Sequence, residues 1–409
     1  MYSRWSLAVF VSLSSFTKAQ SLMIPAGPPV EFTPGAGVVE FDDLTIPVGA
    51  TLRLRGTAPA HVRVRGTLRV DGKLDASGDA AASVNYWIYA ATAPKPGYPG
   101  GPGGGSGGTS NPMLLNYCVA GGDGADGYGI PFGLRGGGGG GESVVSTFAY
   151  EQARGAGGGG GAFGPDLPPI FPDPSGLLNF GRIAKDGQSG GQFGLGAAQH
   201  LPVVAGGKRG LLPFIDDNPD NDFWGRKIDP ITSQVIVGEL SSPRGGSGGG
   251  AGGNRDFDTY PSTYPWSPIH GVQGGIGGGG GGLLILQAQL VVVGATGRIL
   301  VDGGDGDGGM CTSGVNNIGG SGGGGSGGML VLQARRIDLT SAAPACITAI
   351  GGQGGGAYFL QHGHGGDGGP GLVQFHVSNG AADVRLPVGK TLADMTVPNA
   401  HLLVPEPNL

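Results

Sequence analysis

Runs of glycine separated by short apolar segments constrain this chain more than any other feature. Of the 409 residues 92 are glycine, and many lie in unbroken runs such as 136–141 and 277–282. Glycine runs alone are typical of flexible linkers, because glycine loses more backbone entropy on folding than any other residue. Here they alternate with β-branched segments such as Leu290–Val293. This alternation indicates a folded scaffold. We expect its glycine segments to pack at backbone distance, as extended polyglycine helices that hydrogen-bond to one another.

The apolar segments repeat along the chain. Leu284-Ile285-Leu286-Gln287-Ala288 recurs 46 residues later as Leu330-Val331-Leu332-Gln333-Ala334, and a shorter copy begins at Gly371. Each copy follows a glycine-rich run and leads through a second apolar strand into another one. A repeat unit of this kind leaves an apolar face that only its neighbour can cover.

Three short strands near the start alternate polar with apolar residues. Val62-Arg63-Val64, Leu68-Arg69-Val70 and Leu74-Asp75-Ala76 are separated by the tight turns Gly66-Thr67 and Gly72-Lys73. No helical period lies between them. The pattern predicts an all-β chain folded as a right-handed parallel β-helix, a solenoid with glycine-rich loops and long irregular insertions.

Composition shifts divide the chain into four parts. Residues 1–19 resemble a signal peptide, with Arg4, a short apolar core and a small-residue cleavage site before Gln20. Residues 20–85 are expected to form N-terminal coils and residues 271–409 C-terminal repeats. Between them, 86–270 combine glycine-rich loops with proline- and aromatic-rich insertions, where function on a solenoid usually lies.

Charge and cysteine content exclude several classes of protein. Charged residues make up 13% of the chain, its net charge is −6, and its basic residues are scattered, which argues against a nucleic-acid partner. No segment after the leader approaches the roughly 20 apolar residues of a membrane-spanning helix. The three cysteines cannot all pair within the chain; Cys311 and Cys346 could pair or be small buried hydrophobes.

Two stretches carry a family resemblance. Residues 41–56, from Phe41-Asp42-Asp43 to Leu54-Arg55-Gly56, and residues 66–78 resemble the opening of a group of exported, glycine-rich bacterial β-helix proteins, mostly uncharacterised. Residues 242–250 and the units after Gly277 resemble its middle and end. The resemblance covers about two thirds of the chain. It implies a secreted or cell-surface location and no particular activity.

Catalytic motifs match only through the abundance of glycine. The spacing Gly-x-Ser-x-Gly of an esterase nucleophile occurs at four serines: Ser106, Ser247, Ser321 and Ser326. An esterase needs a strand before that serine and a helix after it, and neither pattern is present. We therefore expect a non-enzymatic protein. The alternative is a secreted polysaccharide-active β-helix enzyme, a lyase or glycoside hydrolase, with carboxylates on one face of successive coils.

The densest group of oxygen ligands lies in an insertion and could bind calcium. It comprises Asp216, Asp217, Asp220 and Asp222. Calcium takes about six to eight oxygen ligands, and it could order a loop with little core of its own. The other interpretation is a solvated acidic loop. No other cofactor is indicated.

A proline-stiffened aromatic segment is the best candidate for binding glycans. Its candidate residues are Tyr260, Tyr264, Trp266, Asp256 and Asp258. Aromatic faces pack on the C–H groups of a sugar ring while carboxylates accept its hydroxyls. The rings could instead cap the apolar core. From these features we expect an exported structural or adhesive protein of the bacterial surface or matrix, whose partners are surface polysaccharide or further copies of itself.

Overall fold

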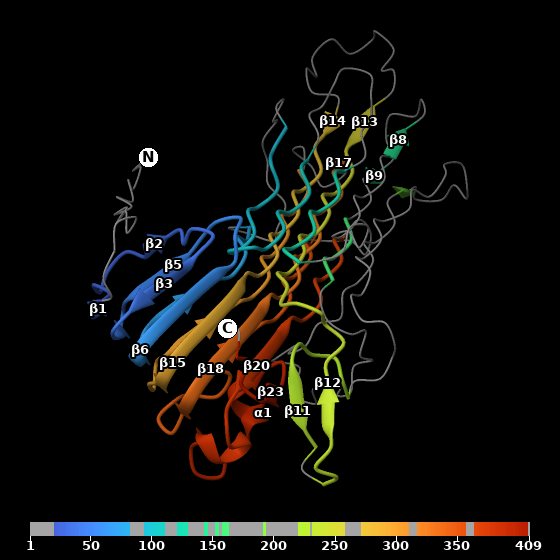
Figure 1. The fold of residues 1–409 in the computed structure, drawn as a ribbon. Coiled ribbons are helices and arrows are strands. Elements are labelled where there is room, and N and C mark those ends of the chain that lie inside the picture. The colour runs from blue at the N-terminus through green and yellow to red at the C-terminus, as the bar shows by residue number, and fades with distance from the viewer. Residues whose placement is uncertain are drawn as a thin grey trace, which may run out of the picture.

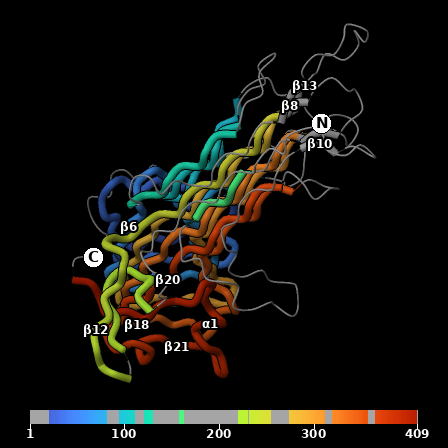
Figure 2. The backbone as a smooth tube through the Cα atoms, turned by 90° about the vertical axis from the view of Figure 1, so that its right-hand side faces the viewer, coloured from blue at the N-terminus to red at the C-terminus, as the bar shows by residue number. Residues whose placement is uncertain are grey.

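The protein consists of two parallel sheets and a bundle of glycine-rich segments that runs away from them (Figures 1 and 2). The computed structural model describes residues 20–81, 94–110, 121–129, 158–162, 220–229, 231–257, 271–310, 317–356 and 364–407, and the backbone of strands at 143–145, 152–154 and 191–193. The predicted signal peptide lies outside the described residues.

The larger sheet has nine strands in the order β1-β4-β6-β15-β18-β20-β23, with β3 beside β6 and β21 beside β18. Every pairing in it is parallel. Its strands are β1 (Leu22–Met23), β3 (Val38–Phe41), β4 (Leu44–Ile46), β6 (Ala60–Val70), β15 (Leu283–Val293), β18 (Met329–Asp338), β20 (Leu372–His376), β21 (Val384–Arg385) and β23 (His401–Leu403).

The smaller sheet has six parallel strands in the order β2-β5-β7-β16-β19-β22. Its strands are β2 (Val30–Phe32), β5 (Thr51–Leu54), β7 (Lys73–Asp75), β16 (Arg298–Leu300), β19 (Ile347–Thr348) and β22 (Thr396–Val397). Long strands of the first sheet are each followed in the chain by a short strand of the second, as β6 is by β7 and β15 by β16.

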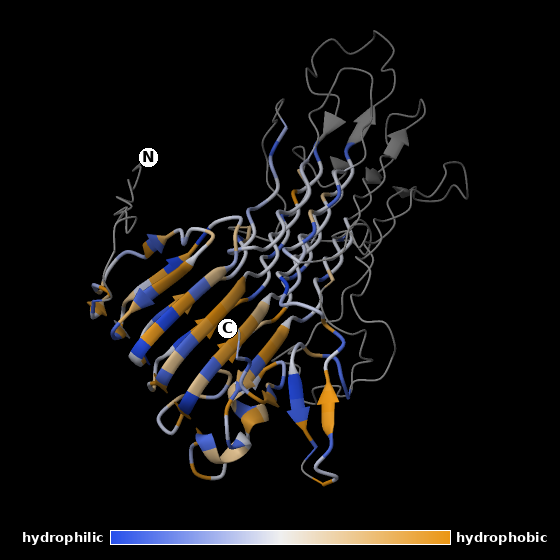
Figure 3. Cartoon of the chain, in the orientation of Figure 1, coloured by the Kyte–Doolittle hydropathy of each residue, from blue (hydrophilic) through white to orange (hydrophobic). Residues whose placement is uncertain are grey.

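One hydrophobic core is shared by the two sheets. In β6 the inward side chains Val62 and Val64 are buried, whereas the alternating Arg63 and Arg65 point out. The same cluster contains Leu286 of the larger sheet and Ile299 of the smaller one. Period-two alternation of this kind places one face of a strand in the core and the other in solvent. Figure 3 shows the apolar residues concentrated in the strands.

The remaining elements are short. Hairpin β11 (Arg226–Ile228) and β12 (Val235–Val237) lies beside β23, a 3-10 helix spans Gly380–Asp383, and α1 spans Leu392–Met395. The described residues also form two three-stranded sheets. They contain β8 (Ser143–Val145), β9 (Gln152–Arg154), β10 (Gly191–Phe193), β13 (Arg255–Phe257), β14 (Gly271–Val272) and β17 (Asn317–Ile318).

The glycine-rich segments form a lattice of backbone hydrogen bonds, as expected from the sequence. Every third residue faces the same neighbour: the N–H groups of Gly246, Gly249 and Gly252 donate to the carbonyls of residues 281, 278 and 275 at 2.8–2.9 Å. Three residues per turn, without hydrogen bonds inside a segment, is the geometry of a polyproline II type helix.

Two of these segments lie in the centre of the lattice. Residues 273–282 and 319–328 hydrogen-bond to each other, and each is also bonded to five further segments. The neighbours of 273–282 are residues 76–81, 94–101, 103–110, 244–254, 301–310 and 319–328, and those of 319–328 are residues 158–162, 244–254, 273–282, 301–310, 349–356 and 364–371.

Glycine is required in this lattice for space. A β-carbon on Gly278 would lie 2.0 Å from the carbonyl oxygen of Gly304, and one on Gly323 would lie 2.1 Å from that of Gly159. Neither residue has a positive φ. Glycine is therefore required at these positions because the absent side chain permits close approach of backbones. A left-handed backbone conformation is not the reason.

The prediction of an all-β, right-handed parallel β-helix is wrong. Among the described residues the strands form two open parallel sheets and no closed solenoid. Residues Ala60 of β6 and Leu284 of β15 are direct partners, so the chain leaves the sheet for more than half its length before the next strand is added. The error lies in the place of the glycine runs and in one turn. The runs form a separate bundle and are not loops along a solenoid, and the turn expected at Gly66-Thr67 lies inside the single strand β6.

Candidate binding groove on the nine-stranded sheet

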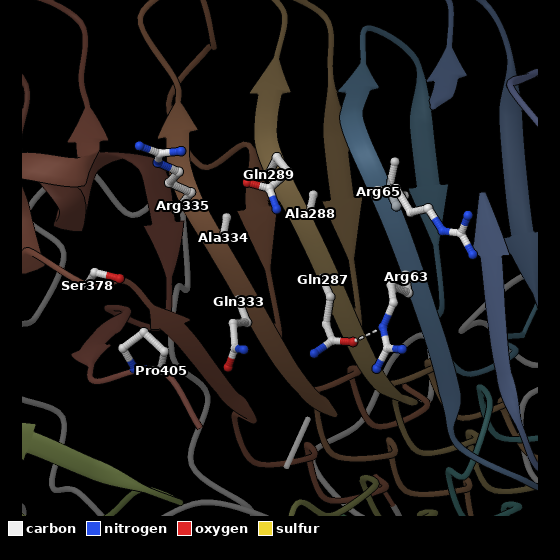
Figure 4. A pocket seen from close by; sticks show the side chains of 11 residues that line it. Arg63, Arg65, Gln287, Ala288, Gln289, Gln333, Ala334, Arg335, Ser378 and Pro405 are labelled. Atoms are coloured by element: carbon white, nitrogen blue, oxygen red, sulfur yellow. Dashed lines mark hydrogen bonds between the residues drawn. The ribbon is translucent and has the colours of Figure 1, made fainter. Parts of the chain in front are cut away.

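The outward face of the nine-stranded sheet contains an open groove of about 590 Å³. It crosses β6, β15 and β18 near their middle (Figure 4). Its lining is polar and contains several arginine and glutamine side chains. The lining residues are Arg63, Val64, Arg65, Gln287, Ala288, Gln289, Gln333, Ala334, Arg335, Ser378 and Pro405.

Strand register assembles the polar floor of this groove. Arg63 on β6 is the direct partner of Gln287 on β15, which is in turn the partner of Gln333 on β18. Neighbouring strands lie about 4.8 Å apart, so these side chains form a ladder with that spacing across the sheet. A register shift between Ala288 and Leu290 places Arg65 and Gly66 opposite Gln289, as a β-bulge does.

One end of the ladder is organised by ionic hydrogen bonds. Arg63 donates from Nε to Oε1 of Gln287 at 2.8 Å and from Nη1 to Glu40 at 3.1 Å. Arg65 donates to the other carboxylate oxygen of Glu40 at 2.9 Å. The hydrogen bonds from Arg65 and then Arg63 lower the pKa of Glu40. The carboxylate of Glu40 is thus shared between two arginines and offsets part of their charge.

The orientations of the two carboxamides follow from their partners. The backbone N–H of Glu406 donates to Oε1 of Gln333 at 3.0 Å, and Nε of Arg63 donates to Oε1 of Gln287. Both partners can only donate, so in each side chain the oxygen must face the partner. The amide NH2 groups, which can only donate, remain on the other side. Nε2 of His61 also lies 3.1 Å from the Gln287 oxygen, which consumes its second lone pair.

Residues 220–229 and 231–240 cover the other part of this sheet face. Leu240 and Trp224 pack on Leu283, Met329 and Leu372, an apolar cluster on the outward side of the sheet. The rings of Trp224 and His376 lie 5.5 Å apart, and those of Phe223 and His401 5.6 Å apart. Burial lowers the pKa of His376 and of His401 to about 4 in each case. The apolar part of the face is covered, and the polar part is the open groove.

The aromatic candidates for glycan binding are not part of this groove. Tyr260, Tyr264, Trp266 and Asp258 lie outside the described residues. Asp256 lies in β13, where its backbone pairs with Gly271 of β14 and Val144 of β8. Chain connectivity therefore joins both ends of the aromatic segment to these short strands, at the end of the bundle away from the two large sheets (Figure 1).

Only two of the four calcium candidates can be placed. Asp216 and Asp217 lie outside the described residues. The backbone carbonyl of the exposed Asp220 accepts a hydrogen bond from Nζ of Lys227 at 2.5 Å. Asp222 is 3% exposed and lines a second cavity, of about 600 Å³, between residues 370–372 and α1. The described part of the chain holds no group of three or more His, Cys, Asp or Glu placed to bind a metal.

The serines that match the esterase spacing are structural residues of the bundle. Ser247, Ser321 and Ser326 are fully buried, and the hydroxyl of Ser326 accepts the backbone N–H of Ser247 at 2.8 Å. Ser106 is exposed on the bundle surface. The expectation that these matches reflect only glycine abundance agrees with this packing.

Cys346 is a buried free thiol, one of the two alternatives open for it from the sequence. Its Sγ donates weakly to the carbonyl oxygen of Met395 at 3.5 Å. Burial raises the pKa of this thiol to about 11. A thiol that remains protonated is a poor nucleophile, so Cys346 acts as a small core residue.

Sequence reasoning missed most of the groove. It placed Arg63 in a strand that alternates polar with apolar residues and did not single out Gln287, Gln333 or Arg335. The available signal was the glutamine at the same position in the first two repeat copies. Since those copies pair in register, a repeated polar residue on the outward face predicts a ladder.

Comparison with protein-family models, with curated proteins and with solved structures finds no match to this chain. In the described residues no helix has the length and apolar character needed to cross a membrane.

Proposed function

We propose that this chain is an exported structural or adhesive protein of a bacterial cell surface or extracellular matrix, with glycans as its ligands. The observation that supports this proposal most strongly is the lattice in which two central glycine segments are each hydrogen-bonded to six others. A lattice of this kind is a rigid spacer, because each segment is held by its neighbours in several directions.

The far ends of the segments support the adhesive role. The backbone N–H of Met310 donates to the carbonyl of Gln273, whose side chain lies 3.5 Å from the carbonyl of Ser110. The side chain of Asn254 accepts the N–H of Gly274 at 3.0 Å. Four segments of the bundle therefore end at the same place. They are the segments that contain Ser110, Asn254, Gln273 and Met310.

The near ends of the same segments support the structural role. Residues 273–282 lead directly into β15, and residues 319–328 lead directly into β18. The backbone lattice and the sheet ladder are thus continuous, with no flexible linker between them. A force applied at the far end would be transmitted to the sheets through many parallel hydrogen bonds.

Retention on surfaces tests the proposal. The purified full chain is incubated with intact bacterial cells and with insoluble polysaccharides, and the bound fraction and any released sugar are measured. We expect retention without sugar release. The double variant Tyr264→Ala/Trp266→Ala should be retained several-fold less. Tyr128→Ala is the matched control, because Tyr128 is an exposed aromatic residue (54% exposed) outside the aromatic segment.

The outcomes separate the competing roles. Released sugar would replace the adhesive role with a polysaccharide-active enzyme. Equal loss in the Tyr128 control would mean that any exposed aromatic ring contributes to non-specific retention. Absence of retention on every surface would contradict the adhesive role.

A further inference from the structure

We propose that the groove on the nine-stranded sheet binds a carboxylate-bearing polysaccharide, a polyuronate chain laid across β6, β15 and β18. The inference rests on the proposed function and names the ligand class of a glycan site distinct from the aromatic segment. It is carried by the donors that the groove presents.

The groove offers hydrogen-bond donors and few acceptors. The carbonyl oxygen of Gln287 is occupied by Arg63 and His61, and that of Gln333 by the backbone of Glu406. The NH2 groups of both side chains are left to donate to a ligand, and they lie one strand spacing apart. A row of donors selects a ligand rich in acceptors.

Among ligands rich in hydrogen-bond acceptors, the charge of the groove favours an anionic one. Arg335 lines the groove, and no carboxylate of the described residues lies within ion-pair distance of it, although its charge acts on Asp383 from farther away. Arg63 and Arg65 share the carboxylate of Glu40, and Arg65 also lies 3.9 Å from the carboxylate of Asp42, so the positive charge left for a ligand is that of Arg335. Guanidinium groups bind carboxylates through paired, charge-assisted hydrogen bonds.

The shape of the groove favours a polysaccharide over other anions. One sugar residue advances a polysaccharide chain by a length close to the strand spacing of about 4.8 Å, so successive sugars can meet successive strands. Among the described residues no aromatic ring lines the groove, whereas single-stranded nucleic acid is usually held by stacking on aromatic side chains. Both lone pairs of the Gln287 oxygen are occupied, so a neutral sugar hydroxyl finds fewer acceptors there than a carboxylate finds donors.

Calorimetric titration of the full chain with a short oligogalacturonate tests this inference. Its methyl ester is the matched ligand, because esterification removes the charge and keeps the sugar backbone. We expect the ester to bind at least about tenfold more weakly, since hydrogen bonds to charged groups are the stronger ones. Affinity for the free acid should fall with added salt.

Two substitutions locate the site. Arg335→Gln should weaken binding of the free acid about tenfold. Arg336→Gln is the matched control, because Arg336 is an exposed neighbour on β18 that does not line the groove. Gln333→Glu replaces a donor with a carboxylate and should abolish binding, while the thermal unfolding midpoint reports whether the variant is folded.

Three results would overturn the inference. They are equal affinity for acid and ester, equal loss in the Arg335 and Arg336 variants, and unchanged binding in a folded Gln333→Glu variant. Retention on cells together with no binding of oligogalacturonate would refute the groove ligand and leave the proposed function standing. Absence of retention on every surface would refute the proposed function itself.

Discussion

The backbone N–H of Gly278 donates to the carbonyl of Gly323 at 2.9 Å, joining the two central segments of the glycine bundle. The two residues lie in consecutive repeat units, and the segments that contain them run parallel to each other, side by side. Each is enclosed by neighbouring backbones, so the bundle has a core built from main chain. The close approach that makes this core possible also makes it intolerant of side chains.

Alanine in the centre of the bundle should therefore be strongly destabilising. In Gly278→Ala the new β-carbon would lie 2.0 Å from a backbone oxygen that cannot move alone. We expect the free energy of unfolding to fall by more than about 3 kcal/mol. Gly35→Ala is the control, because a β-carbon at Gly35 meets nothing within 4 Å. Chemical denaturation of both variants measures the difference. Equal stabilities would contradict the close-packed lattice.

Removing the Ser326 hydroxyl should cost stability without a steric effect. The hydroxyl accepts the buried N–H of Ser247, and Ser326→Ala leaves that donor without its partner. An unsatisfied buried donor costs about 1–3 kcal/mol. Ser106→Ala, at an exposed position with the same Gly-x-Ser-x-Gly spacing, should change stability by less than about 0.5 kcal/mol. Thermal unfolding of the two variants compares them. A larger loss for Ser106 would indicate a role that the packing does not explain.

The His401 ring should make stability depend on pH. Burial, with a smaller contribution from the charge of Lys227, lowers its pKa from 6.5 to about 4. Between those values the unfolded chain binds more protons than the folded chain, so stability falls as the pH is lowered through this window. His401→Phe can keep the ring contact with Phe223 and removes the titration. Relative to the wild type, the variant should gain up to about 3 kcal/mol as the pH falls from near 6.5 to near 4.

Urea denaturation of both proteins across this window measures the effect. Parallel stability curves would show that His401 is not buried in the neutral form. His376, whose Nδ1 lies 3.0 Å from the carbonyl of Val404, should contribute a similar slope. For this reason the difference between variant and wild type is the quantity to follow.

Asp302 should make stability depend on pH in the direction opposite to that of His401. Burial raises its pKa from 3.8 to about 6, although hydrogen bonds from Ile350 N and Thr348 Oγ1 oppose the shift. The folded chain then binds more protons between those values, and the stability contributed by the protonated form is lost as the pH rises through about 6. Asp302→Asn is neutral at every pH and keeps an acceptor for the backbone N–H of Ile350.

The stability of Asp302→Asn relative to the wild type should therefore rise between about pH 4 and pH 7. Denaturation at several pH values checks this, with Asp305→Asn as the control because Asp305 is a neighbouring acid in the same glycine-rich loop. A relative stability that falls with pH would mean that the carboxylate form is favoured in the folded state.

Local sequence patterns determined the parts of this protein. The alternation around Arg63 predicted which side chains of β6 face the core, and the repeat at Leu284 and Leu330 predicted two strands that pair in register. The glycine runs predicted backbone packing in extended helices. These features depend on neighbours within a few residues or on direct repetition.

Only the tertiary structure decided how the parts are joined. Pairing of β6 with β15 brings together residues more than 200 positions apart, and no local pattern specifies that such strands form open sheets beside a separate bundle. The third repeat shows the same limit. Its Gln374 aligns by sequence with Gln333, yet it pairs with Val331, and His376 takes the place opposite Gln333. A shift of two residues keeps the same faces in and out, so alternation cannot detect it, and long-range packing alone determines which side chains form the groove.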